Sequence, residues 1–160
     1  MRVFLFIYMI KLADLLKEEK QVGTLYHHTR YFNAANILKT NELCSSREAY
    51  DDGMYAISFS RDSRLHGNFL SHEGGDELRF VIDGSKLSER YKIRPFSDIG
   101  YRGSEAEEQI VKKAWFCIPI LDYVEHIDFL SKPEDGFNRK YYDKVIEFCK
   151  EKGIKVNIVY

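Results

Sequence analysis

The sequence predicts an α+β fold, and three observations support this prediction. Short stretches that alternate apolar and polar residues, as strands do, outnumber stretches with helical spacing. The two kinds of stretch do not alternate regularly, which argues against a fold of repeated strand–helix–strand units. The chain has 160 residues and no internal repeats, low-complexity tracts or linkers rich in Pro and Gly. We therefore expect a single domain over residues 1–160.

The predicted helices have apolar residues on one face. They cover residues 9–19, about 33–39, and 139–152, and Gly153 stands just past the end of the last as a C-terminal cap. The predicted strands are residues 24–27, 54–60, 76–83, 91–94, 124–130 and 154–160. Residues 105–111 fit either a strand or a helix, residues 115–119 are expected to be buried, and residues 61–75 form a long polar loop.

Composition limits the classes of function. The formal net charge is −1, which argues against a broad nucleic-acid surface. The apolar run at residues 1–10 is much shorter than a membrane span, and residues 1–8 would be an extension without a role in the fold if translation began at Met9. The three cysteines are an odd number without CxxC spacing, so we expect neither a disulfide nor a metal site, and a cytoplasmic location.

Polar residues gather where residues 24–30 leave a predicted strand and enter a predicted helix. Rigid elements on both sides can hold such residues in place for a ligand. Two later stretches, residues 56–61 and 104–111, carry further polar residues of the same kind. We predict that the three segments converge on one site.

The three segments resemble motifs of the ADP-ribosyltransferase superfamily, in particular its small phage-encoded members. The first is Tyr26-His27-His28-Thr29, followed by a helix with Ala34-Ala-Asn-Ile-Leu38. The second is Ser58-Phe59-Ser60, and the third is Glu105-Ala106-Glu107. The resemblance covers residues 24–111 and implies split β-sheets with flanking helices.

The resemblance also implies an activity and a role for each site residue. NAD would be the co-substrate, and Glu107 would be the catalytic carboxylate, with Glu105 orienting the acceptor. The expected function is mono-ADP-ribosylation of a host macromolecule, a protein or a nucleic acid, in the host cytoplasm if a phage encodes the chain. The residues expected to bind NAD are Tyr26, His27, Thr29, Ser58, Ser60 and, at the pyrophosphate, Arg61.

Other interpretations of the same residues stay open. His28 stands where the family has a small residue, which favours a binding module with a degenerate site for a nucleotide, a nucleic acid or a protein. A transferase that processes an RNA phosphate is a third hypothesis, which the Glu105–Glu107 pair disfavours. Individually, His27 could be a strand-end histidine bonded to a backbone carbonyl, and the glutamates at 105, 107 and 108 could be one solvated helix face.

Overall fold

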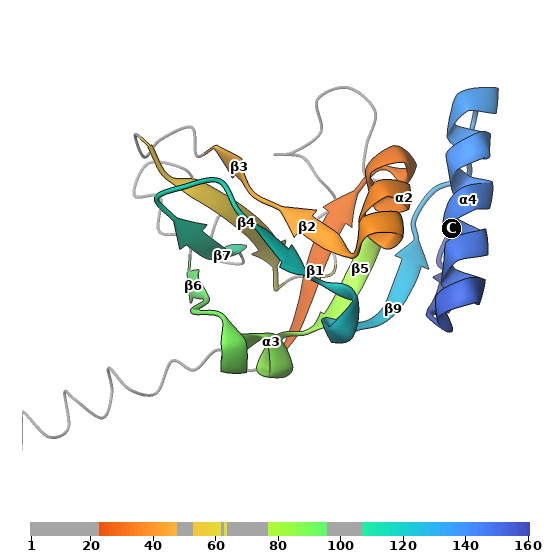
Figure 1. Ribbon diagram of the computed structural model, residues 1–160. Coiled ribbons are helices and arrows are strands. Elements are labelled where there is room, and N and C mark those ends of the chain that lie inside the picture. Colours follow the sequence, from red (N-terminus) through yellow and green to blue (C-terminus); the bar gives the residue numbers. More distant parts are fainter. Residues whose placement is uncertain (1–22, 48–52, 62, 64–76, 96–106) are drawn as a thin grey trace, which may run out of the picture.

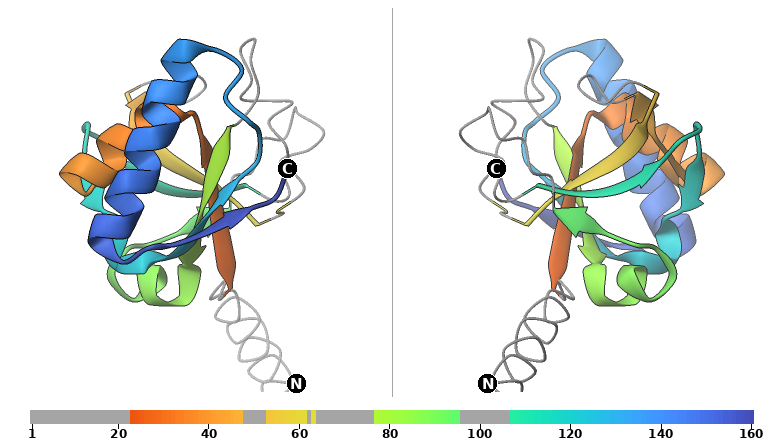
Figure 2. Two further views of the ribbon diagram at one scale, coloured as in Figure 1. Left: turned by 90° about the vertical axis from the view of Figure 1, so that its right-hand side faces the viewer. Right: turned by 90° about the vertical axis from the view of Figure 1, so that its left-hand side faces the viewer.

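The computed structural model describes residues 23–47, 53–61, 63, 77–95 and 107–160, and shows a mixed α+β arrangement (Figure 1). Two helices, α2 (Tyr31–Thr40) and α4 (Gly136–Lys152), pack beside each other and against the sheet. Figure 2 shows α4 lying across the strands. The predicted α+β class is therefore confirmed.

The larger sheet has eight strands among the described residues, in the order β10-β9-β5-β1-β4-β7-β6, with β3 paired to β4. Its centre is β1, which runs antiparallel to both β5 and β4. Within this sheet, the parallel pair is β10 with β9. The bounds are β1 Thr24–Thr29, β3 Ser46–Arg47, β4 Tyr55–Ser60, β5 Leu78–Asp83, β6 Arg94–Pro95, β7 Glu107–Lys112, β9 Val124–Phe129 and β10 Lys155–Ile158.

These bounds confirm five of the six predicted strands and show that residues 107–112 form a strand. The strand predicted at residues 91–94 is mostly wrong. Helix α3 (Gly84–Arg90) reaches this point, and the Tyr91 N–H still donates to the Leu87 carbonyl at 3.0 Å. Residue 91 is therefore fixed as the C-cap of α3, and strand pairing begins only at Arg94.

The helix predictions for residues 33–39 and 139–152 are confirmed, with ends that depend on capping. Asp135 accepts a hydrogen bond from the Asn138 N–H at 2.7 Å, so α4 begins at Gly136, before the predicted start. Gly153 ends the helix with a φ of 68°, a conformation that glycine adopts without strain. The predicted helix at residues 9–19 and nearly all of the 61–75 loop lie outside the described residues.

A second, smaller sheet pairs β2 (Glu42–Cys44) with β8 (Cys117–Pro119). Leu43 and Ile118 face each other across this pair and are buried in the core. The prediction that residues 115–119 are all buried is wrong for Trp115, whose side chain is 62% exposed. Phe116 fills the buried position instead, because alternate residues of an extended chain point to opposite sides.

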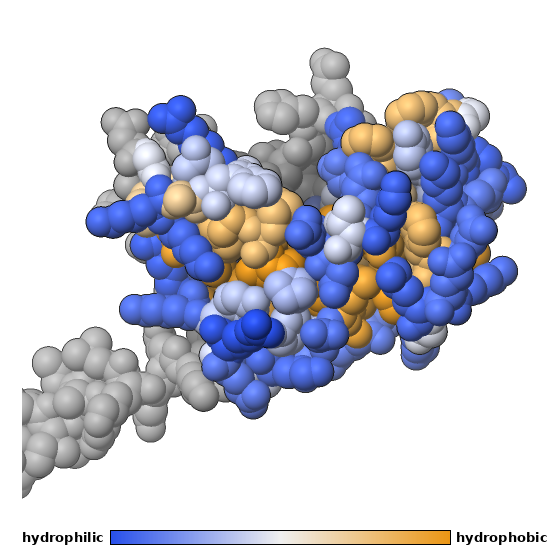
Figure 3. Space-filling model, viewed as in Figure 1, coloured by the Kyte–Doolittle hydropathy of each residue, from blue (hydrophilic) through white to orange (hydrophobic). Residues whose placement is uncertain are grey.

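The core lies between the helices and one face of the large sheet. Its largest fully buried side chains come from both, and Figure 3 shows apolar atoms at the centre of the view, surrounded by polar ones. Such burial is the main favourable contribution to folding. The fully buried aromatic residues are Tyr31, Phe59, Phe80 and Phe129. Within the described residues, no helix is both long and apolar enough to cross a membrane.

The expectation that the chain has no disulfide is wrong. Cys44 and Cys117 form one, which joins β2 to β8 across a sequence separation of 73 residues. Cysteine spacing could not reveal it, because the two residues become neighbours only through the register of the small sheet. Cys149 is a buried free thiol.

The different surroundings of the cysteines predict a stepwise thiol count. Burial raises the pKa of the Cys149 thiol to about 11, so almost no nucleophilic thiolate forms near pH 8. With an aromatic disulfide reagent, the oxidised native protein should show no fast thiol. After reduction it should show two fast thiols, and the third should react only in denaturant. A fast Cys149 signal, recognised by its loss in Cys149→Ala, would contradict this assignment.

Candidate functional site

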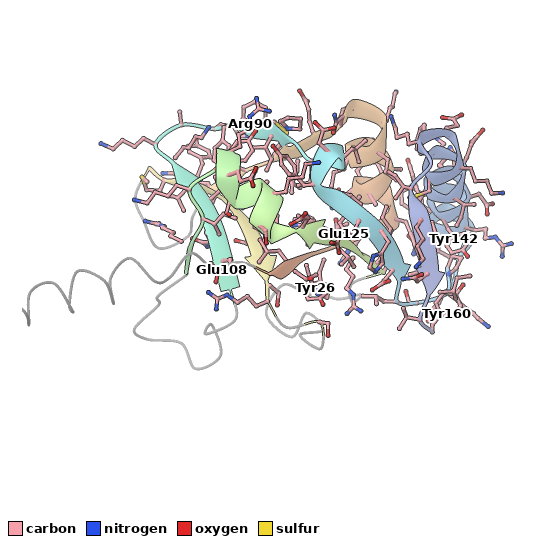
Figure 4. All side chains as sticks on the ribbon, turned by 90° about the horizontal axis from the view of Figure 1, so that it is seen from below. Tyr26, Arg90, Glu108, Glu125, Tyr142 and Tyr160 are labelled. Carbon is pink, nitrogen blue, oxygen red and sulfur yellow. A yellow bond between two sulfur atoms is a disulfide. The ribbon has the colours of Figure 1, made fainter. Side chains whose placement is uncertain are left out.

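The strands that carry the three sequence motifs are neighbours in the large sheet, in the order β1-β4-β7. Tyr26 on β1 pairs with Ser60 on β4, and Ser60 pairs with Glu107 on β7. These residues therefore form one row across the three strands. Figure 4 shows Tyr26 and Glu108 on the two outer strands of this set. The predicted convergence of the three segments is confirmed at the level of the strands.

The two faces of these strands differ in character. The face toward the helices, called here the helix face, carries Leu25, Thr29 and Phe59, all of them buried. Because strand residues alternate, neighbouring residues point to the other side. This other side, called here the polar face, includes Tyr26, His28, Ser58, Ser60, Arg79, Gln109 and Asp128.

The alternation divides the residues predicted to bind NAD. Tyr26, Ser58 and Ser60 belong to the polar face, whereas His27 and Thr29 belong to the helix face. Contacts support this division. The Arg79 guanidinium lies over the Tyr26 ring at 5.0 Å on one side, and the His27 ring packs near the buried Phe59 ring at 6.1 Å on the other.

His27 holds two strands of the site together. Its Nδ1 is 3.1 Å from the carbonyl oxygen of Ser58, so the partly buried ring bridges β1 and β4. Since a carbonyl oxygen only accepts, Nδ1 carries the proton in this bond. This is the strand histidine bonded to a backbone carbonyl that the sequence left open as an alternative. The centroid of the Phe80 ring lies 6.5 Å from the centroid of the His27 ring.

Glu108 is a buried carboxylate that the sequence reasoning did not select. It lies opposite Phe59, on the helix face, with 1% of its side chain exposed, and it forms an ion pair with the Arg61 Nε. The solvated helix face considered for these glutamates is therefore wrong at Glu108. Glu107 is the first residue of β7, and Glu105 lies outside the described residues.

Charged and polar groups on the polar face satisfy one another. The Arg79 guanidinium contacts the Asp128 Oδ2 through Nε at 2.9 Å and through Nη2 at 2.8 Å. The other Asp128 oxygen is 3.0 Å from the Asn157 Nδ2 and 3.3 Å from the His126 Nε2. A guanidinium fork suits such a carboxylate. The network was missed because its members lie on three strands that only the fold brings together.

The Gln109 side chain extends the polar face toward β4. It is buried, and its Nε2 donates to the Ser58 Oγ at 3.3 Å. Ser58, predicted to bind NAD, is thus held from two strands. Gln109 on β7 contacts its hydroxyl, and His27 on β1 contacts its carbonyl. The arrangement fixes the middle of β4 on both of its sides.

Glu77 is a third buried carboxylate that the sequence reasoning missed, after Glu108 and Asp128. Its Oε2 accepts the Tyr31 N–H at 2.5 Å, at the first residue of α2, where the N-cap residue Arg30 makes no capping bond. A carboxylate is favourable at a helix N-terminus. Burial nevertheless raises the pKa of Glu77, and the Tyr31 bond and the nearby Arg30 charge oppose that shift. The Glu77 N–H also donates to the Thr29 carbonyl at 3.2 Å, so Glu77 links the end of β1 to the start of α2.

The comparisons with known proteins leave the family of this chain open. No model of a known protein family matches it, and no curated protein matches it either.

The Glu77 environment predicts a pH dependence of stability. Its pKa is raised in the folded state from the ordinary value of 4.5, so the folded protein binds this proton more tightly than the unfolded chain does. The contribution of Glu77 to stability is therefore present below pH 4.5 and is lost as the pH rises through the folded-state pKa. Glu77→Gln should remove this loss, because the amide oxygen still accepts the Tyr31 N–H.

Chemical denaturation at a series of pH values measures this effect. The difference in unfolding free energy between Glu77→Gln and the wild type should shift in favour of the variant as the pH rises. The exposed strand residue Glu125 provides a control, and Glu125→Gln should leave the slope unchanged. A difference for Glu77→Gln that stays constant with pH would show that Glu77 is not the group that titrates.

The Arg61–Glu108 pair predicts energetic coupling. Arg61→Met should lower the free energy of unfolding by about 1–3 kcal/mol, because the buried Glu108 carboxylate loses this partner. The expected loss is moderate because water partly screens the charge of the exposed Arg61 guanidinium. The double variant Arg61→Met with Glu108→Gln should lose less unfolding free energy than the sum of the losses in the two single variants. The exposed Arg139–Asp143 pair, at 3.6 Å, is a matched control that should show almost no coupling. Additive losses of unfolding free energy in the Arg61 and Glu108 variants would show that the two side chains are not energetically coupled.

Proposed function

We propose that the protein is an NAD-dependent mono-ADP-ribosyltransferase that modifies a host macromolecule. The observation that carries the proposal is the cross-strand row Tyr26–Ser60–Glu107. Three sequence segments that resemble the transferase motifs, separated by dozens of residues, lie on the adjacent strands β1, β4 and β7. Two separate sheets, with helices packed against the larger one, also support the proposed split-sheet fold of that superfamily.

The reaction would break the bond between the nicotinamide nitrogen and the anomeric carbon of the ribose. Positive charge grows on the ribose as nicotinamide leaves, and the Glu107 carboxylate would stabilise that charge. A nucleophile of the acceptor then bonds to the same carbon, and its proton passes to Glu107. Glu105 would orient the acceptor.

Residues of β1 and β4 would hold NAD in place. Ser58, Ser60 and Tyr26 would offer hydroxyl groups to NAD from the polar face, while His27, from the helix face, would keep β4 fixed against β1 through the Ser58 carbonyl. Thr29, buried at the end of β1, would support this strand end. Arg61 would contact the pyrophosphate. Its Nε already pairs with Glu108, but a guanidinium has five N–H donors, so a second contact through its other nitrogens is compatible with this pair.

A binding module with a degenerate site is the alternative function. It is favoured by a specific observation: His27 and Arg61, both expected to contact NAD, already have protein partners in Ser58 and Glu108. His28, where the family has a small residue, points the same way. Such a protein would bind a nucleotide, a nucleic acid or a protein without turnover.

Two measurements on the purified chain test the proposal, namely calorimetric titration with NAD and nicotinamide release. Glu107→Gln should keep NAD affinity within a few-fold while lowering nicotinamide release by about 10²–10⁴-fold, the usual contribution of such a group. The matched control is Glu125→Gln, on the exposed side of another strand, which should change neither quantity. His27→Ala should weaken NAD binding by loosening β4.

The outcomes separate the two functions. NAD binding with no nicotinamide release in the wild type, or no NAD binding at all, would support the binding module. Release that persists unchanged in Glu107→Gln would remove Glu107 from its proposed role.

A further inference from the structure

The small sheet presents three metal-binding side chains on one face. Glu42 and Cys44 are two residues apart on β2 and therefore share a face, and Cys117 on β8 lies directly opposite Cys44. Leu43 and Ile118, between them, point the other way into the core. One oxygen of Glu42 and the two sulfur atoms all lie within 4.8 Å of one another. Glu42 and Cys44 are exposed, so this face is accessible.

The backbone holds the two cysteines together independently of the bond between them. The Ser45 N–H donates to the Phe116 carbonyl at 2.8 Å, and the Phe116 N–H donates to the Ser45 Oγ at 3.0 Å. The next pair along, Cys44 and Cys117, is then the non-hydrogen-bonded kind in which side chains lie closest, and its Cα atoms are 3.9 Å apart.

Further anchors keep this register. Burial of Leu43 and Ile118 ties both strands to the core. Beside the pair, the Leu121 N–H donates to the Asn41 Oδ1 at 2.9 Å. None of these contacts involves a sulfur atom. Reduction of the disulfide therefore leaves two thiols next to each other, with the Glu42 carboxylate beside them.

We propose that the reduced form of this cluster is a site for Zn²⁺, with Cys44, Cys117 and Glu42 as its protein ligands. Zinc binds thiolate sulfur at about 2.3 Å and carboxylate oxygen at about 2.0–2.2 Å in a tetrahedron. Ligand atoms around such an ion stand roughly 3.5 Å apart, so small side-chain rotations suffice. Two sulfur ligands select zinc over magnesium or calcium, which prefer oxygen. Three protein ligands leave the fourth position to water.

The site would be gated by oxidation. A dithiol reductant supplies two electrons and two protons, which break the sulfur–sulfur bond and leave two thiols, while the reductant becomes a disulfide. Zinc binding then releases the two thiol protons. Removal of two electrons by a disulfide oxidant restores the Cys44–Cys117 bond and expels the ion. The disulfide and the metal site are thus two forms of one cluster.

Cobalt titration of the full chain tests the proposal. Co²⁺ takes the place of Zn²⁺ and reports thiolate ligands by a charge-transfer band and tetrahedral geometry by visible ligand-field bands. After anaerobic reduction and removal of the reductant, one Co²⁺ per chain should bind with both signals, and Zn²⁺ should displace it. The oxidised protein should bind none. Absence of these bands in the reduced protein, or equal binding in the oxidised protein, would overturn the proposal.

Variants assign the ligands. Cys44→Ser should abolish the charge-transfer band, and Cys149→Ala should keep it. Glu42→Gln should weaken binding by at least about tenfold, since even residues that only orient a ligand change metal affinity by about 10–100-fold. Glu125→Gln should have no effect. Unchanged affinity in Glu42→Gln, or loss of the band in Cys149→Ala, would refute the three-ligand site.

Thermal unfolding provides an independent readout. Zn²⁺ should raise the Tm of the reduced wild type, and it should raise that of Glu42→Gln less at the same concentration, because the stabilisation by a ligand increases with the logarithm of its affinity. Equal shifts for the two proteins would count against Glu42 as a ligand even if a cysteine variant folded poorly.

Discussion

The fold depends on the antiparallel pairing of the central strand β1 with β5 on one side and β4 on the other. This pairing decides which residues of the first motif face the helices and which face away. Leu25 and His27 are committed to the helix face because their neighbours across the strands, including Phe80 and Ile82, form the core there. A shift of one residue would exchange every side chain between the two faces. The apolar burial on the helix face thus fixes the geometry of the polar face as well.

Three buried carboxylates lie around this central strand, and each has an ion-pair or hydrogen-bond partner. Glu108 pairs with Arg61, Asp128 with Arg79, and Glu77 accepts the first N–H of α2. An isolated charge at a fully buried position would cost several kcal/mol, and the cost is smaller where one partner, such as Arg61, is partly exposed to water. These pairs therefore hold their strands in one arrangement, and they leave a rigid frame around β4. A frame of this kind suits a site whose reacting groups must not move, whichever ligand it takes.

One face of the small sheet packs into the common core, and the other face carries the two cysteines and Glu42. Leu43 and Ile118 belong to the common core, whereas Cys44, Cys117 and Glu42 lie on the outer face. A change of oxidation state at the sulfur atoms can therefore occur without a change in core packing. The proposed transferase site and the proposed zinc site share no residue, so each can be present without the other.

Local patterns determined the elements of this protein. Alternation identified five strands, and helical spacing identified α2 and α4. The polar residues of three segments led to the prediction that these segments converge, and β1, β4 and β7 are neighbours in the sheet. Only the tertiary structure decided which residues face each other. The Cys44–Cys117 bond, the exposure of Trp115 and the pairing of Glu108 with Arg61 all depend on cross-strand register. Register is set by packing between segments far apart in the chain, and spacing along one segment carries no record of it.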